Sequence, residues 1–294
     1  MKVATAAYPL DVLSSWAQYE DKLFAWVRDA ADADLLVFPE YGAMELATLA
    51  GMNAAGDLEQ SIHAVSDRLP RAAALHARLA DEFDVHILAA SAPVVQETGR
   101  PVNQARLFAP GGNQGAQDKQ IMTRFEAEVW DIAPGGPLQL FDTALGRIGV
   151  LICYDSEFPL LGRALHEADV ILVPSVTEAL SGYSRVKIGA QARALENQCV
   201  TVMSSIVGGA DWNEALGSTV GAGGVFGPPD RGFPETGILS LGALNAPGWT
   251  FADFDLDAIA AVRADGGVLN RRDWACQTGR AEAVTITRLR RNAP

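Results

Sequence analysis

Short apolar runs of strand-like composition alternate along this chain with longer stretches of helical pattern. The runs span residues 2–8, 34–40, 85–95, 147–154, 169–176, 199–207 and 237–244. The helical stretches cover about Ser14–Ala31, Asp57–Phe83, Leu160–Ala168 and Gly182–Gln198. Two further segments, 103–110 and 137–143, have the pattern of antiparallel strands. Alternation of this kind predicts an α/β fold in which helices cover the faces of sheets.

No linker, charge block or internal repeat divides the 294 residues, so we expect one domain. We assign residues 1–265 to this domain. Residues 266–294, which contain the motifs NRRDW and TRLRR, are interpreted as a C-terminal extension. This extension is expected to be either an exposed tail or an arm at an oligomer interface.

Composition and charge exclude several classes of protein. The formal net charge of −13 leaves no basic surplus for nonspecific nucleic-acid binding. No apolar run approaches the roughly 20 residues that a membrane-spanning helix needs. The three cysteines, Cys153, Cys199 and Cys276, have no CxxC spacing, which indicates neither a disulfide framework nor a zinc site. We therefore expect a cytoplasmic protein without membrane or nucleic-acid partners.

Three residues near strand ends are candidates for chemistry, because ligands in α/β proteins collect at the carboxyl ends of strands. Glu40 ends the run LLVFPE, Cys153 ends RIGVLIC, and Lys119 follows a loop in the segment GAQDKQ. Each also has a simpler interpretation: a solvated glutamate, a buried cysteine and a solvated lysine. A cysteine at a strand-to-helix turn lies near a helix N-terminus, whose partial positive charge is expected to lower the thiol pKa.

Taken together, these motifs resemble the nitrilase superfamily of carbon–nitrogen hydrolases. That family pairs a glutamate in "FPE", a lysine in a mid-chain loop and a cysteine in "ICYD". This chain has FPEYGAMEL, DKQIM and LICYDSEFP in the same order, followed by ADVILVPS and AQARALENQCVTVMSS. The resemblance runs from about Lys2 to Asp255. The resemblance is greatest to a bacterial branch that is sometimes fused to an acetyltransferase-like domain. We expect this chain to be a stand-alone hydrolase of that branch.

The resemblance implies a fold, a mechanism and an assembly. The fold is a four-layer α-β-β-α sandwich of two six-stranded-type sheets. Glu40 would be the general base, Cys153 the nucleophile that forms a thioester, and Lys119 with the Tyr154 backbone N–H would stabilise the oxyanion. No metal or organic cofactor is implied. Members commonly form homodimers through helices that flank the site, here the helix Gly182–Gln198 and the helix after Cys153.

A second glutamate in the family helps to position the lysine. Family members often place it six residues before a Pro-Gly pair, and this spacing selects Glu128 over its competitor Glu126. We expect Tyr154, Glu178 and Tyr183 to line the pocket on the side that binds the substrate.

Two departures from the family pattern bear on the substrate. The pair Tyr154-Asp155 after the cysteine is typical of amide-hydrolysing branches more than of true nitrilases. Glu157 stands where the ω-amidase-like branch has a carboxylate-pairing arginine. An acidic Glu157 and Glu178 near the nucleophile favour a neutral or amine-bearing substrate over an anionic one. Asp155, Arg193 and Glu196 are interpreted as structural, with the last two spaced for an ion pair on one helix.

The function we predict is hydrolysis of a non-peptide C–N bond in a small amide, with release of ammonia or an amine. The nearest alternative is an N-carbamoyl amidohydrolase, followed by a nitrilase. A catalytically silent binding protein on the same fold is the alternative of a different class. A cysteine–histidine hydrolase is a further rival, which would use one of the four histidines: His63, His76, His86 and His166.

Overall fold

The computed structural model describes residues 1–97, 99–280 and 282–289. Its strands are β1 (Lys2–Pro9), β2 (Leu35–Val37), β3 (His86–Leu88), β4 (Ala92–Val95), β5 (Pro101–Phe108), β6 (Gln114–Asp118), β7 (Leu140–Thr143), β8 (Gly146–Val150), β9 (Val170–Ser175), β10 (Val200–Val207), β11 (Gly224–Phe226), β12 (Ile238–Leu241) and β13 (Gly248–Asp253). Its helices are α1 (Trp16–Asp29), α2 (Met52–Gly56), α3 (Leu58–Ser66), α4 (Leu69–Phe83), α5 (Arg124–Glu128), α6 (Pro159–Ala164), α7 (Leu180–Asn197), α8 (Leu256–Asp265) and α9 (Asn270–Asp273). Short 3₁₀ turns are η1 (Gly42–Ala50), η2 (Cys153–Glu157), η3 (Glu214–Leu216) and η4 (Trp274–Gln277).

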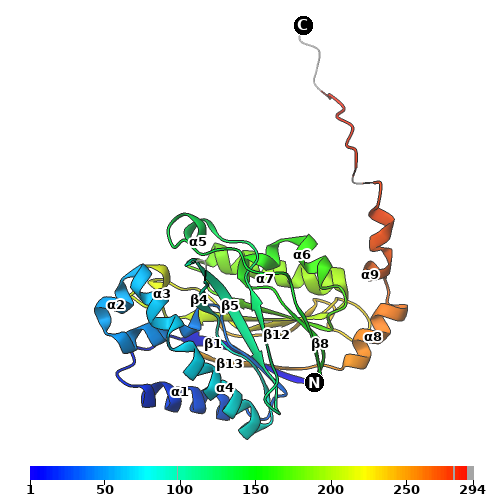
Figure 1. Ribbon diagram of the computed structural model, residues 1–294. Helices are drawn as coiled ribbons and strands as arrows, with labels where there is room; N and C mark the ends of the chain where they lie inside the picture. Colours follow the sequence, from blue (N-terminus) through cyan, green and yellow to red (C-terminus); the bar gives the residue numbers. More distant parts are fainter. Residues whose placement is uncertain (98, 281, 290–294) are drawn as a thin grey trace.

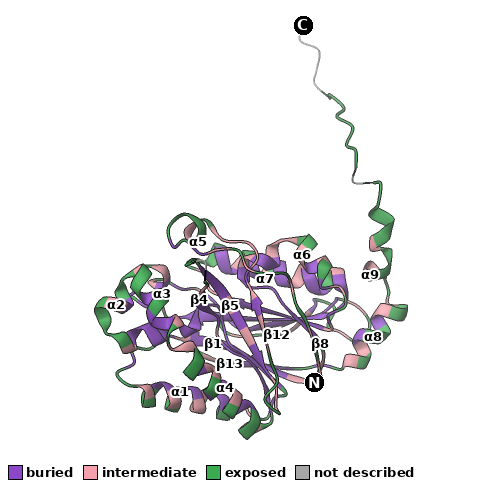
Figure 2. Ribbon diagram, in the orientation of Figure 1, coloured by how far each residue is buried: buried purple, intermediate pink, exposed green. Residues whose placement is uncertain are grey.

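Four layers are stacked in the order helix, sheet, sheet, helix, as expected (Figure 1). Helices α1 and α4 cover one sheet face, where Ala4, Ala6 and Leu36 pack in one core with Leu23 and Leu79. Helices α6 and α7 lie on the opposite side of the molecule (Figure 1). Side chains adjacent in sequence to those that face α1 and α4 point to the opposite face of the sheet, because side-chain direction alternates along a strand. These inward residues fill the space between the two sheet halves, which Figure 2 shows as buried.

The two halves are joined into one curled sheet rather than being separate sheets. The cause is β1, whose residues Val3–Thr5 pair with β2 on one edge. On the other edge Lys2–Ala7 pair with β13 and Ala7–Pro9 pair with β10. One strand therefore carries the hydrogen-bond ladder from one half to the other. Both β5 and β7 are antiparallel to their neighbours, which confirms the prediction for segments 103–110 and 137–143.

The predicted helix Asp57–Phe83 is in fact two helices. Helix α3 ends at Ser66 and α4 begins at Leu69 with Pro70 in its first turn. Proline has no N–H to donate and its ring clashes with the preceding turn, so it is tolerated at a helix start but not in a helix interior.

The C-terminal segment is in contact with the rest of the chain at its beginning and exposed at its end. Asp230 accepts the N–H of Gly267 at 2.8 Å, and Arg271 donates from Nε to the His166 carbonyl at 2.9 Å. Residues 282–289 are exposed and lead away from the body (Figure 1). Among the described residues, no helix is both long and apolar enough to cross a membrane.

Candidate active site

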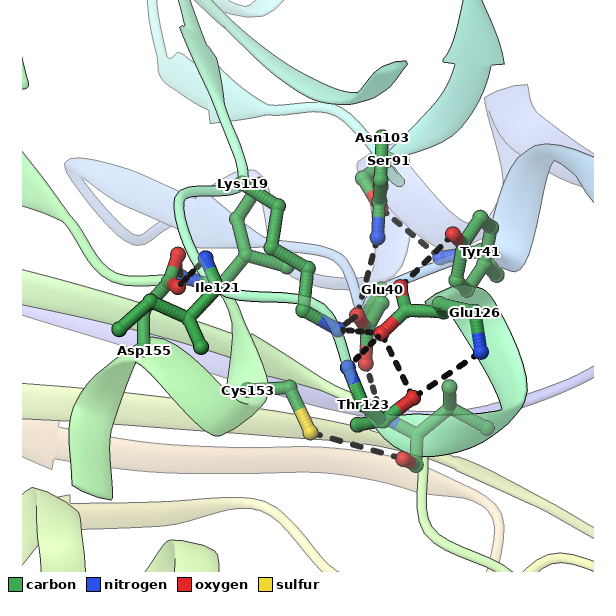
Figure 3. Close-up of polar contacts among 12 residues, drawn as sticks. Glu40, Tyr41, Ser91, Asn103, Lys119, Ile121, Thr123, Glu126, Cys153 and Asp155 are labelled. Atoms are coloured by element: carbon green, nitrogen blue, oxygen red, sulfur yellow. Dashed lines mark hydrogen bonds and ion pairs between the residues drawn. The ribbon is translucent and has the colours of Figure 1, made fainter. Parts of the chain in front are cut away.

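Glu40, Lys119 and Cys153 meet at one edge of the sheets, where β2, β6 and β8 end (Figure 3). They line a cavity of about 550 Å³. The Lys119 ammonium lies 2.7 Å from Glu40 Oε1, although 79 residues separate them in sequence. The three residues predicted from strand ends therefore share one site.

Cys153 begins the turn η2 in a left-handed backbone conformation, with φ of 49°. A residue with a Cβ adopts this conformation at a cost of about 1–2 kcal/mol, and such strain is concentrated at functional sites. The thiol lies 3.6 Å from the Val176 carbonyl oxygen, to which it can donate. Burial raises the pKa of the Cys153 thiol well above its ordinary value, and the Glu40 carboxylate raises it further. The predicted lowering of this pKa is therefore wrong, because burial and the neighbouring Glu40 carboxylate raise it.

Glu40 is held by three hydrogen-bond donors. Its Oε1 accepts from Asn103 Nδ2 at 2.9 Å and from Lys119, and its Oε2 accepts the Val176 N–H at 3.0 Å. Asn103 is fixed in turn by the Ser91 hydroxyl, which donates to its Oδ1 at 2.6 Å. Burial raises the pKa of Glu40 above its ordinary value, against the opposing effect of the Lys119 charge. A carboxylate with a raised pKa accepts a proton more readily and is suited to general-base chemistry.

Lys119 lies between two carboxylates and is only 1% exposed. Its Nζ is 2.7 Å from Glu40 Oε1 and 2.6 Å from Glu126 Oε2. Burial by itself would lower the pKa of Lys119, but the charges of Glu40 and Glu126 reverse the effect and raise it. The lysine is therefore a fixed cation at the base of the cavity.

The glutamate beside the lysine is Glu126, which corrects the sequence-based choice of Glu128. Glu128 is an exposed residue whose carboxylate pairs with Arg124 at 2.9 Å, four residues earlier on α5. Because residues four apart share one helix face and α5 turns this face to solvent, Glu128 cannot reach Lys119 in this structure.

A capping box fixes Glu126, and its signature is present in the sequence as Thr123-Arg124-Phe125-Glu126. The Glu126 side chain accepts the Thr123 N–H at 2.9 Å, and Thr123 caps the first turn of α5. The other carboxylate oxygen accepts the Tyr41 hydroxyl at 2.9 Å. Burial would raise the pKa of Glu126, but Lys119 and Thr123 lower it below its ordinary value. The two carboxylates on Lys119 thus have pKa values shifted in opposite directions.

Asp155 ties the lysine loop to the cysteine turn. Its carboxylate accepts the N–H groups of Gln120 at 3.1 Å and Ile121 at 2.8 Å, the two residues that follow Lys119. It also accepts the Ile152 N–H at 3.3 Å, just before Cys153. Burial raises the pKa of Asp155 to about 7. The structural role predicted for Asp155 is consistent with these contacts, as is the predicted ion pair of Arg193 with Glu196 at 2.9 Å.

Two of the three expected substrate-side residues line the cavity. Tyr154 and Glu178 do, whereas Tyr183 is on the buried face of α7, packs in the core and does not line the cavity. The expectation for Tyr183 is wrong because α7 turns the neighbouring residues, Gly182 and Arg185, to the cavity instead. Further lining residues that sequence reasoning did not name as site residues are Tyr41, Thr123, Phe125, Trp130, Val176, Thr177 and Glu214.

No histidine lines this cavity, although all four belong to the described part of the chain. His76 and His86 are buried elsewhere, and His166 contacts the segment around Arg271. A cysteine–histidine dyad is therefore not formed in this structure. Among the described residues there is also no group of three or more potential metal-ligating side chains.

Comparison with known proteins identifies the family of this chain. The sequence model of the carbon-nitrogen hydrolase family matches residues 3–228. The Bacillus subtilis protein named "Probable hydrolase YhcX" is 30% identical over 282 residues, which are 93% of this chain and 53% of that protein. An (R)-stereoselective amidase from Pseudomonas sp. is 31% identical over 255 residues, which are 83% of this chain and 81% of the amidase. The chain thus spans about half the length of the first relative and most of the second.

Solved structures share the fold. A variant of the amidase from Nesterenkonia sp. AN1, with the acetamide moiety of fluoroacetamide added covalently at its active-site cysteine, superposes with a TM-score of 0.65 at 20% identity. The match covers 96% of this chain and 97% of the amidase. The four-layer fold and the family match over residues 3–228 lead to one conclusion: this chain belongs to the carbon–nitrogen hydrolase family.

Proposed function

We propose that this protein is an amidase, which hydrolyses a non-peptide C–N bond of a small amide through a cysteine thioester. The observation that carries the proposal is the burial of Glu40, Lys119 and Cys153 side by side at the base of one cavity. A thiol, a carboxylate of raised pKa and a fixed ammonium are the parts that nucleophilic acyl transfer needs. No step of this chemistry requires a metal or an organic cofactor.

In the acylation half of the reaction, Glu40 takes the proton from Cys153 Sγ as the sulfur attacks the amide carbon. The oxygen of the resulting tetrahedral species carries the negative charge, which the Lys119 ammonium and the Tyr154 N–H stabilise. Tyr154 is the second residue of η2, in the first turn, where backbone N–H groups have no acceptor within the helix. The C–N bond then breaks, Glu40 returns the proton to the leaving nitrogen, and a thioester remains on Cys153.

In the second half, Glu40 takes a proton from a water molecule that attacks the thioester carbon. The new oxyanion uses the same two donors, and its collapse breaks the C–S bond. The proton on Glu40 returns to the cysteine sulfur, so that the thiol and the carboxylate are restored. One carboxylate therefore serves as base and acid in turn, for which a pKa above the ordinary glutamate range is suited.

A panel of substrates tests this function. We expect ammonia release from small aliphatic amides, with slower or no turnover of N-carbamoyl compounds and nitriles of matched size. Preference for the carbamoyl compounds would favour the N-carbamoyl amidohydrolase alternative. Failure of every amide and carbamoyl compound, with an unreactive Cys153, would favour the silent binding protein.

The same panel tests the charge of the substrate. Glu178 and Glu214 are exposed residues of the cavity lining. Glu157 also lines the cavity, but its carboxylate forms an ion pair with Arg185 at 3.4 Å. We propose that the excess of carboxylates at the cavity disfavours anionic amides. Glutaramate should therefore be a poorer substrate than hexanamide or 5-aminopentanamide, and the reverse order would contradict the proposal.

Glu126 is proposed as the residue that positions Lys119, and the pair Glu126→Gln and Glu128→Gln tests it. Glu126→Gln should lower kcat by about 10²-fold, because the ammonium loses one of the two anions that hold it. Glu126 also raises the pKa of Glu40, so its neutral replacement should move the acid limb of the kcat/KM profile to lower pH. Glu128→Gln should leave both quantities unchanged, because an exposed ion pair contributes little. Loss of activity in Glu128→Gln alone would restore the sequence-based choice.

We propose that two copies of the chain associate through α6 and α7. Large apolar side chains are exposed there: Leu160 is 76% exposed, Ile188 63% and Leu180 56%. Ile188→Glu should convert an assembled protein to a monomer in light scattering, whereas Val12→Glu, at an exposed position between β1 and α1, should not. A monomeric parent protein would refute the proposal.

We propose a cytoplasmic location, because the three cysteines are free, as is usual in a reducing compartment. Cell fractionation that finds the protein outside the cytoplasm would overturn this proposal.

A further inference from the structure

A second cavity lies on the outer face of the sheet, between α4 and the strands β4 and β5. Its volume is about 340 Å³, within the range of small-molecule sites. Its wall is mostly apolar, and the lining includes Leu69, Ala73, Ala90, Ala92 and Phe108. None of these residues lines the cavity of Cys153.

The two cavities lie on opposite faces of the same strand. Ala92, Gln104 and Phe108 line the second cavity, whereas Asn103, one residue from Gln104, turns the other way and donates to Glu40. A molecule in the second cavity would therefore not compete with the substrate. This separation makes the inference independent of the proposed amidase function.

Two buried polar side chains in the lining have a group without a protein partner. Tyr19 is 3% exposed and His76 is 5% exposed. His76 Nδ1 lies 2.8 Å from the Ala72 carbonyl oxygen, which can only accept, so Nδ1 carries the proton and Nε2 is an acceptor. Burial lowers the pKa of His76 to about 4, so the ring is neutral at neutral pH. Within residues 1–97, 99–280 and 282–289, no hydrogen bond reaches His76 Nε2 or the Tyr19 hydroxyl.

Other polar groups in the lining already have partners. Ser66 Oγ accepts the Val95 N–H at 3.1 Å. Arg106 donates to Gln114 at 3.2 Å and to Gln104 at 3.0 Å, one hydrogen bond from each terminal nitrogen. Ser66, Gln104 and Arg106 are only partly buried, so the unpaired groups on fully buried side chains of the lining are uncharged: one acceptor on His76 and one hydroxyl on Tyr19. Because neither atom is bonded within the described part of the protein, both are available to a molecule that enters the cavity.

We propose that this cavity is a binding site for a small neutral molecule that has an apolar body and a hydroxyl group. The apolar body packs against the alanine and Phe108 side chains. The hydroxyl donates to His76 Nε2 or accepts from the Tyr19 hydroxyl. A cavity of about 150 Å³ lined by apolar side chains already holds benzene in another protein, so a ring of that size fits here.

Phenol and toluene are the matched probes, because they differ only in a hydroxyl and a methyl group. Titration calorimetry on the full chain at neutral pH should show one saturable phenol site with a dissociation constant of about 1 mM or lower. Toluene should bind at least about 5-fold more weakly, because it leaves the buried polar groups unpaired. No saturable phenol binding, or equal binding of the two probes, would overturn the proposal and leave a site for water alone.

Variants locate the site. Ala73→Leu fills the cavity from α4 and should weaken phenol binding at least about 10-fold. Ala74→Leu is the control, since it makes the same change at an exposed position of the same helix. Tyr19→Phe keeps the ring shape, removes only the hydroxyl, and should weaken phenol binding with little effect on toluene. Unaltered phenol binding in Ala73→Leu, with its thermal unfolding unchanged, would place the probe elsewhere and refute the site.

Discussion

Cys153→Ala should lower kcat/KM for the best amide by at least about 10⁴-fold, the largest effect of any single substitution in this chain. The sulfur is the atom that forms the thioester, and no other side chain of the cavity lining is a thiol. What remains would be the contribution of Lys119 and the Tyr154 N–H, which stabilise an oxyanion but cannot form the acyl-enzyme. Steady-state ammonia release measures the loss.

A matched control is available in Cys199→Ala. Cys199 is also a buried free cysteine, but its sulfur lies 3.7 Å from the Arg193 carbonyl, outside the cavity. Burial raises its pKa to about 12, so it is chemically inert at neutral pH.

Fluoroacetamide should alkylate the parent protein once, with loss of fluoride, and mass spectrometry of peptides should place the adduct on Cys153. Activity retained by Cys153→Ala would rule out the thioester mechanism.

Glu40→Gln should lower kcat by about 10²–10⁴-fold, which is the usual contribution of a general base. The substitution keeps the size of the side chain and removes its capacity to take the thiol proton. It also places an amide NH₂ among three donors, from Asn103, Lys119 and Val176. Because the Cys153 thiol has a raised pKa, it is not deprotonated without a base.

The pH profile separates catalysis from folding in this variant. Glu40 must be ionised to accept the proton, so kcat/KM of the parent protein should fall as the pH drops through the raised Glu40 pKa. In Glu40→Gln this acid limb should disappear. Glu45→Gln is the control, since Glu45 is equally buried but binds Tyr8 and Lys22 outside the cavity. It should lower the free energy of unfolding and leave the acid limb in place; an unchanged profile in Glu40→Gln would exclude Glu40 as the base.

The positions of Glu40 and Cys153 could be predicted from the sequence because each directly follows a continuous apolar strand. Such strands are buried on both faces, and the next polar residue emerges at the sheet edge. Local sequence does not identify Lys119, since β6 has a polar sequence, QGAQD, that does not follow the pattern of a buried strand. Its assignment depended on the order of the family motifs.

The choice between Glu126 and Glu128 needed a different signal. Distance from the Pro-Gly turn selects Glu128, but the first turn of a helix is fixed by its cap, and Thr123 makes Glu126 the inward residue. No local pattern in the sequence identifies Asn103, whose contact with Glu40 joins residues 63 apart. Tyr183 was misplaced because helical position alone does not say which face of α7 meets the sheet.

The single strand β1 that joins the two sheet halves also has a consequence for how the protein folds. One edge of β1 pairs with the nearby β2, but on the other edge Lys2 pairs with Asp253 and Ala7 with Ser205, so this second edge is completed only when most of the chain exists. Contacts this distant in sequence make folding slow, because loop closure must precede the stabilisation that it allows. Glu40 is synthesised before the three residues that donate hydrogen bonds to its carboxylate, which come from β5, from the end of β6 and from the residues after β9. We therefore expect the arrangement of Glu40, Lys119 and Cys153 to form only in a chain long enough to include β10 and β13.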